Sequence, residues 1–201
     1  IYENEQNLGT PIQTTAKRCT PFTDSFTSGY IQELICDVRF KYLGKDENGK
    51  DLYNYSWYGG ISPMGTREEE TGVPNFFPQF PGYAHAEFQW FSFWEPKTPK
   101  GWSTLYSHPH NRLDLPFHTF TGIIDTDMWP ITGPVPFVIK EGFDGVIKAG
   151  TPIYQMTFIK RANWKSERGV YDKIQEKMKH QAQKHFSGGY KRGFWERKTF
   201  S

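Results

Sequence analysis

The strongest constraint on the fold is a change of hydrophobic period near residue 167. Before it, apolar and polar residues alternate in short runs, most clearly from Leu34 to Tyr42. Asn48 and Gly49 form a typical hairpin turn ahead of another alternating run. Short alternating runs separated by Pro and Gly predict antiparallel strands. We expect strands at 34–42, 53–57, 86–94, 102–107, 117–124, 135–140 and 153–159.

Beyond residue 167 the apolar period becomes helical. Val170, Ile174 and Met178 recur every four residues, Ser166 is a suitable N-cap, and Gly188 with Gly189 would end the helix. The sequence therefore predicts a mainly β fold, a barrel or sandwich, followed by one basic helix at about 167–185. The expected organisation is an extended N-terminal arm at 1–28, a β-rich core domain at 29–160 with a long loop at 59–82, and a basic helix and aromatic tail at 161–201.

Composition supports a packed core and excludes some classes of protein. The 201 residues include 17 Phe, 11 Tyr and 7 Trp, and each buried aromatic side chain hides about 150–250 Å². No apolar run reaches the roughly 18 residues that span a bilayer, so no membrane association is expected. The first residues lack a basic and an apolar segment, which predicts no signal peptide. Cys19 and Cys36 form no CxxC pair, and reduced thiols are expected.

Charge is unevenly distributed along the chain. Residues 1–159 hold 12 Lys/Arg and 18 Asp/Glu, whereas residues 160–201 hold 12 Lys/Arg and only 4 Asp/Glu. In this tail, Lys191, Arg192 and Trp195 place cations beside aromatic rings, which could bind phosphates and stack on nucleic-acid bases. The same charges could instead dock on the acidic body of a neighbouring subunit, or the helix could simply be solvated.

Three histidines are candidate metal ligands. His108 and His110 are spaced to share one face of a strand, and His118 follows them. Their spacing loosely resembles the first motif of the cupins, which implies a jelly-roll alternative for the fold and a metal-dependent enzyme as one hypothesis. Asp114 stands where that family has Glu, and no second motif follows.

Two further blocks resemble the dUTPase family. Gly122-Ile-Ile-Asp-Thr-Asp and Gly150-Thr-Pro-Ile-Tyr-Gln-Met are similar to its third and fourth motifs. The resemblance implies a β-clip fold and a nucleotide pyrophosphohydrolase with Mg²⁺ and nucleotide, in which Asp125 orients the attacking water and Gln155 belongs to the site. Met128 occupies the position of the tyrosine that stacks under the base, and the phosphate-binding motifs have no clear counterpart.

A wider resemblance covers most of the chain. The blocks at 97–103, 108–111, 122–127 and 150–153 are similar, in the same order, to an uncharacterised family of phage and bacterial proteins. That similarity implies a viral origin and a location in the virion or the host cytoplasm, without implying an activity.

An aromatic, proline-rich segment in the long loop completes the set of candidates. Phe76, Phe77 and Phe80 offer apolar surface with little hydrogen-bonding capacity, which is typical of a contact surface. The favoured function is a non-enzymatic structural or binding protein, without a cofactor, that assembles with copies of itself or with other virion proteins. A trimer is the expected oligomer by analogy, and nucleic acid is a further candidate partner of the basic tail.

Overall fold

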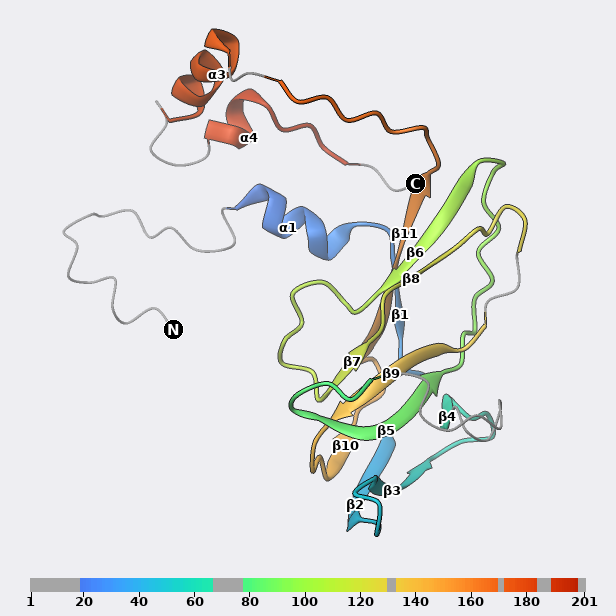
Figure 1. Ribbon diagram of the computed structural model, residues 1–201. Helices are drawn as coiled ribbons and strands as arrows, with labels where there is room; N and C mark the ends of the chain where they lie inside the picture. Colours follow the sequence, from blue (N-terminus) through green and yellow to red (C-terminus); the bar gives the residue numbers. More distant parts are fainter. Residues whose placement is uncertain (1–18, 67–77, 130–132, 170–171, 184–188, 199–201) are drawn as a thin grey trace, which may run out of the picture. The chain divides into compact units, whose positions relative to one another are not determined.

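The structure is a computed structural model that describes residues 19–66, 78–129, 133–169, 172–183 and 189–198 (Figure 1). The chain divides into two compact units. One is Gly29–Asn163, called here the β unit. The other combines Ile1–Ser28 with Trp164–Ser201 and is called the terminal unit. The two ends of the chain thus belong to one unit, although the sequence suggests two separate appendages.

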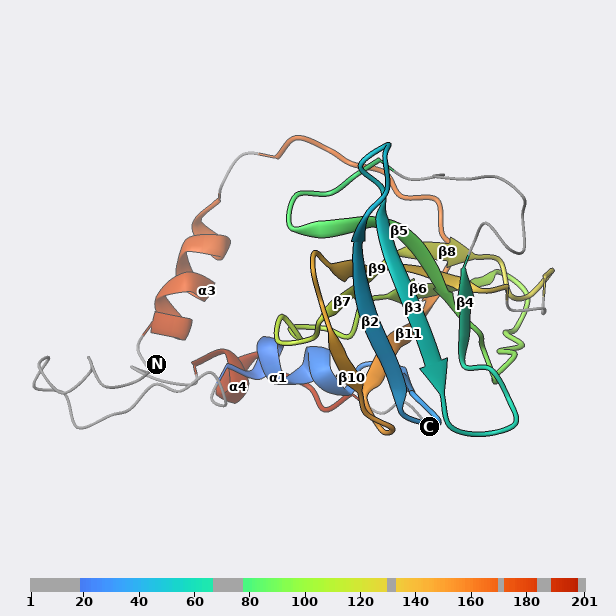
Figure 2. The same cartoon turned by 90° about the horizontal axis from the view of Figure 1, so that it is seen from below.

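The β unit consists of three antiparallel sheets (Figures 1 and 2). Sheet A has the order β1 (Tyr30–Glu33), β11 (Pro152–Lys160), β6 (Trp102–Ser107) and β8 (Gly122–Ile124). Sheet B has the order β10 (Gly145–Ile147), β2 (Val38–Lys45) and β3 (Asp51–Trp57). Sheet C has the order β4 (Met64–Thr66), β5 (Tyr83–Trp90), β9 (Val135–Lys140) and β7 (Phe117–Thr119). Within the described residues no sheet closes into a barrel. The predicted mainly β class is confirmed, and the open sheets are consistent with a sandwich.

Aromatic side chains fill the core of the β unit. On β2, Val38 and Phe40 are buried while Arg39 and Lys41 are exposed, as the alternating pattern predicts. The fully buried Trp90 ring stacks on Phe137 with centroids 3.7 Å apart. Each such ring hides a large apolar area, so these contacts are a main source of the stability of the core. Cys19 and Cys36 are free thiols.

One buried hydroxyl links sheet C to sheet A. Thr119, at the end of β7, accepts a hydrogen bond from the Trp90 indole N–H at 3.2 Å. The same hydroxyl donates to the Ile153 carbonyl of β11 at 2.6 Å. Every polar group in this chain of hydrogen bonds therefore has a partner inside the core.

The strand predicted at 86–94 is shifted to Tyr83–Trp90, and two other strand predictions are wrong in their extent. The strand expected from Leu34 begins only at Val38, because the Leu34 backbone bonds instead to Gly150 and Thr151. The run expected at 117–124 is divided at Phe120–Thr121 into β7 and β8, which belong to different sheets. Both differences arise from pairing with residues far away in the sequence, which a local pattern does not contain.

The described part of the terminal unit contains three helices and stretches without regular secondary structure. Its helices are α1 (Thr20–Thr27), α3 (Lys173–Gln183) and α4 (Gly189–Gly193). The expectation of an extended arm is wrong at α1, where Pro21 fits the first turn and hydroxyls bond back to helix carbonyls, as from Thr23 to Thr20. None of the described helices is long and apolar enough to cross a membrane.

The C-terminal helix is shorter than predicted. Residues 167–169 are not helical, and the helix α3 begins at Lys173. Asp172, rather than Ser166, caps it, since its carboxylate accepts hydrogen bonds from the backbone N–H groups of Ile174 and Gln175 at 2.9 Å. Gly189 begins α4 instead of ending a helix.

Candidate functional site

Asp125, the candidate catalytic carboxylate, lies in a polar cluster just after β8. Ser103 donates a hydrogen bond to its Oδ1 at 2.6 Å, and Arg161 Nη1 lies 3.0 Å from the same oxygen. Arg161 also holds both carboxylate oxygens of Asp127, one of them at 2.9 Å. Asp127 Oδ2 further accepts the Gly101 backbone N–H at 2.7 Å.

This cluster has the features of a structural clamp. The Asp127 side chain is only 3% exposed, and the hydrogen bonds from Arg161, followed by that from Gly101, lower its pKa to about 2. Between the two carboxylates, the Thr126 hydroxyl bonds to Thr104 at 2.8 Å. A bidentate arginine fixes geometry and charge together, so the cluster joins the turn after β8 to the end of β11.

Gln155 is at the other end of the sheet from Asp125. It is buried, and its Oε1 accepts the backbone N–H of His110 at 3.0 Å. Gln155 pairs with Ser107 on β6, whereas Asp125 bonds to Ser103 on the same strand. Ser103 and Ser107 are four residues apart along β6, which corresponds to about 13 Å. Within one chain, the two residues of the dUTPase-like hypothesis do not form a common site.

The three histidines are engaged in hydrogen bonds and stacking. His108 accepts the Thr119 backbone N–H at Nδ1 (3.2 Å), so its Nε2 donates to the Arg112 carbonyl at 3.0 Å. Its ring stacks on His118 with centroids 4.7 Å apart, while His110 bonds to Ser107 at 3.1 Å. Burial lowers the pKa of both His108 and His118. Among the described residues, no group of three His, Cys, Asp or Glu side chains is arranged to hold a metal ion.

The basic tail residues divide into engaged and exposed ones. The Trp195 indole N–H donates to Asp24 of α1 at 2.8 Å. The ammonium groups of Lys191 and Lys198 lie 5.9 and 5.4 Å from the Trp195 ring centroid, and Lys198 also pairs with Asp24 at 3.3 Å. Arg192 is exposed. Because cations and a carboxylate already contact Trp195, the tail binds α1 within the terminal unit, and this ring is a poor platform for bases.

The aromatic loop is described only in part. Phe76 and Phe77 lie outside the described residues. Phe80 is exposed by about a third and contacts Phe120 with ring centroids 5.3 Å apart. One aromatic side chain of the predicted contact surface therefore packs partly on its own β unit.

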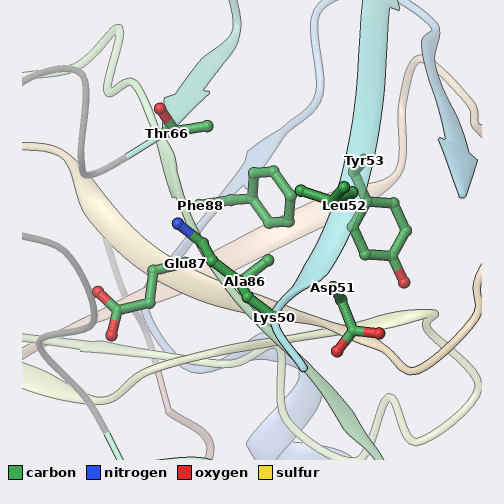
Figure 3. A pocket seen from close by; sticks show the side chains of 8 residues that line it. All are labelled: Lys50, Asp51, Leu52, Tyr53, Thr66, Ala86, Glu87 and Phe88. Carbon is green, nitrogen blue, oxygen red and sulfur yellow. The ribbon is translucent and has the colours of Figure 1, made fainter. Parts of the chain in front are cut away.

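A cavity of about 160 Å³ opens between β3 and β5 (Figure 3). Its Asp51 carboxylate is buried and satisfied, with Tyr42 O–H donating to Oδ1 at 3.0 Å and the His85 N–H donating to Oδ2 at 2.8 Å. Asp51 and Glu87 point to different sides of the cavity, so they do not form a pair for acid–base chemistry. Burial raises the pKa of Tyr53 to about 12. The wall is formed by Lys50, Asp51, Leu52, Tyr53, Thr66, Ala86, Glu87 and Phe88.

One side of sheet A carries an apolar surface that the sequence analysis missed. Register places Thr157, Leu105 and Ile123 in one row across β11, β6 and β8, and alternation puts Ile31 and Ile159 on the same side. Ile31 is 45% and Ile123 is 65% exposed. We call these five residues the apolar strip. A solvated sheet face is normally polar, and the sequence of β11 gives no clear signal for this surface, since Ile159 alternates with Gln155 and Thr157 on that side.

Neither a scan against protein-family models nor a search of curated proteins found a match for this chain.

Proposed function

We propose that this chain is a non-enzymatic structural protein that assembles with copies of itself, as a trimer by analogy, through its terminal unit. The observation that carries the proposal is that every described core residue belongs to the β unit. Among the described residues of the terminal unit, by contrast, the large apolar side chains other than Trp195 are exposed by a third or more. They are Phe22, Phe26, Trp164, Ile174, Met178, Tyr190 and Phe194.

The described part of this unit buries little apolar surface that could offset the cost of its own ordering. Fixing the backbone costs about 1–2 kcal/mol per residue, and folded units offset this chiefly by burying apolar surface. The contacts around Trp195 and Asp24 are polar or partly exposed and contribute little by comparison. A second molecule that covers the apolar side chains supplies the missing burial.

The geometry of the candidate catalytic residues also favours a structural role. Asp125 is held by Ser103 and Arg161, Gln155 is used by the His110 backbone, and both ring nitrogens of His108 are hydrogen bonded. The similarity of four sequence blocks to phage and bacterial proteins supports a virus particle as the setting of the assembly. Other proteins of that particle are further candidate partners.

Light scattering coupled to size-exclusion chromatography tests the proposal on the full chain. We expect a mass that is a multiple of 23.5 kDa and that falls on dilution. A mass of 23.5 kDa at every concentration would contradict it. Turnover of any deoxynucleoside triphosphate in the presence of Mg²⁺ would overturn the non-enzymatic part of the proposal.

A further inference from the structure

We propose that His108 is an acid-sensitive latch, which holds the turn at 108–116 against β7 while its imidazole is neutral and releases the turn when the imidazole is protonated. The latch lies within the β unit and goes beyond the proposed assembly, on which it does not depend. It links the end of β6 in sheet A to β7 in sheet C.

The hydrogen bonds of His108 require a neutral ring. Its Nδ1 accepts the Thr119 backbone N–H at 3.2 Å, so Nδ1 carries a lone pair. Its Nε2 lies 3.0 Å from the Arg112 carbonyl oxygen, which only accepts, so Nε2 carries the proton. An imidazolium fits only the second bond, because both of its nitrogens are donors. A proton taken up by Nδ1 therefore breaks the bond to Thr119.

That bond holds the outer edge of β7. This three-residue strand is at the edge of sheet C, where its neighbour is β9. On the opposite side of β7, the Thr119 N–H bonds to His108, which directly follows β6 of sheet A. Loss of the bond leaves two N–H donors facing each other, and the ring must move to relieve this contact.

A second imidazole opposes the charged state of the first. His118, the middle residue of β7, stacks on His108 with ring centroids 4.7 Å apart and an angle of 30° between the planes. Burial lowers the pKa of both rings, and the neighbouring His118 also lowers the pKa of His108. Two positive charges at this distance repel each other, so protonation of both rings drives them apart.

The charged groups of the turn do not offset this effect. The acidic side chain that acts on His108 is Asp114. Asp114 is already bound by Arg112, whose Nε and Nη2 each donate to one of its carboxylate oxygens at 2.8 Å. The effects of Arg112 and Asp114 on the charge of His108 are opposite in sign. His110, in the same turn, bonds to the Ser107 hydroxyl at 3.1 Å.

Sheet C adds no negative charge beside the two rings among the described contacts. Tyr83 of β5 contacts the His118 ring with centroids 6.1 Å apart. Lys140 of β9, which pairs with Tyr83, donates to the Leu113 carbonyl at 3.4 Å and is itself a cation. An imidazolium at His108 or His118 is therefore stabilised best by water, outside the closed turn.

Opening of the turn exposes apolar side chains. Leu115 and Phe117 are only 5% and 1% exposed, and Phe117 packs on Trp90 with ring centroids 5.1 Å apart. Because the closed turn needs a neutral His108, it is fully favoured above about pH 6.5 and loses this advantage as the pH falls. The hairpin of β2 and β3 takes no part in these bonds and should remain closed.

Hydrogen exchange of the full chain, followed by mass spectrometry, tests the latch. Rates at about pH 7.5 and about pH 5 are each divided by the intrinsic amide exchange rates, and the lower pH is chosen to protonate histidine. Protection of peptides within 108–119 should fall about tenfold or more at the lower pH, whereas the β2–β3 hairpin keeps its protection. Equal protection of 108–119 at both pH values would overturn the proposal, as would an equal loss in both segments, which indicates global unfolding.

Two asparagine variants assign the effect to one ring. In His108→Asn the side-chain oxygen can accept the Thr119 N–H but does not titrate, so protection of 108–119 should be the same at both pH values. His180→Asn is the matched control, because His180 is exposed on α3 and should leave the pH difference unchanged. A pH difference that persists in His108→Asn would contradict the latch.

A third variant and a spectrum of the native chain complete the test. His118→Asn removes the charged neighbour, so opening should persist with its midpoint at a higher pH; loss of opening would assign the switch to His118 instead. Nitrogen-15 NMR of the native chain should show His108 neutral with its proton on Nε2 at about pH 7.5 and as an imidazolium at about pH 5. A ring that stays neutral while 108–119 opens would refute the mechanism even if His108→Asn does not fold.

Discussion

Replacing Thr119 with valine tests whether one hydroxyl couples sheets A and C. Valine has nearly the shape of threonine, so the change leaves no cavity but removes the acceptor of the Trp90 indole N–H and the donor to the Ile153 carbonyl. Trp90 is fully buried, so no water replaces the lost acceptor. Leaving a buried polar group without a partner costs about 1–3 kcal/mol. With two such groups, we expect Thr119→Val to lower the free energy of unfolding by about 2–4 kcal/mol.

Urea denaturation followed by tryptophan fluorescence measures this change, with the free energy obtained by linear extrapolation. Thr121→Val is the matched control, because Thr121 is exposed and should change stability by less than about 0.5 kcal/mol. Thr119→Ser keeps the hydroxyl and should lose only about 1 kcal/mol for the missing methyl group. A loss below about 1 kcal/mol for Thr119→Val would refute the reasoning.

Three further predictions concern acid stability and backbone geometry. The hydrogen bonds from Arg161 hold the pKa of Asp127 at about 2, below the ordinary value of about 3.9. The ionised Asp127 carboxylate therefore contributes fully to stability above about pH 4, and this contribution is lost as the pH falls toward 2. Asp127→Asn should flatten the pH dependence of the unfolding temperature in that range, which differential scanning fluorimetry measures. Burial lowers the pKa of His108, so the neutral imidazole contributes fully to stability above about pH 6.5, and this contribution is lost at lower pH. His108→Asn should reduce that loss in the same assay. An unchanged pH dependence of the unfolding temperature would contradict a buried neutral imidazole. Gly29 has a φ of +72°, and a Cβ there would lie only 1.9 Å from the Met156 carbonyl oxygen. Gly29→Ala should therefore be severely destabilising in urea, whereas Gly49→Ala, with a similar φ but open space, should cost only about 1 kcal/mol.

The hairpin of β2 and β3 shows what the sequence could predict. Alternation marks both strands, and Asn48 and Gly49 mark the turn, where Gly49 adopts a φ of +79°. All of these signals lie within twenty residues. The strand boundary at Val38 could not be predicted in this way, because it depends on hydrogen bonds between Leu34 and residues 150–151.

The helix α3 illustrates a second limit. Its apolar period was visible and Ser166 was the predicted cap, but the structure shows that the Asp172 carboxylate accepts the first free N–H groups instead. Likewise, the apolar strip could not be predicted without the register of three strands. Thr157, Leu105 and Ile123 are neighbours only because β11, β6 and β8 pair in this register.

The residues of the turn after β8 that resemble a hydrolase motif also have structural partners within the β unit. Asp125 and Asp127 are retained by the fold itself, because Arg161 bridges both carboxylates and Gly101 donates its N–H to the second. Thr126 between them is buried and bonded to Thr104. Each polar residue of the block thus has a structural reason to be where it is, independent of any nucleotide. Asp125 is a weak candidate for positioning water, because its carboxylate already bonds to Ser103 and Arg161. Displacing Arg161 would leave Asp127 as a buried unpaired charge. The same bonds hold the end of β11 in place, which fixes the point from which the chain leaves sheet A for the terminal unit.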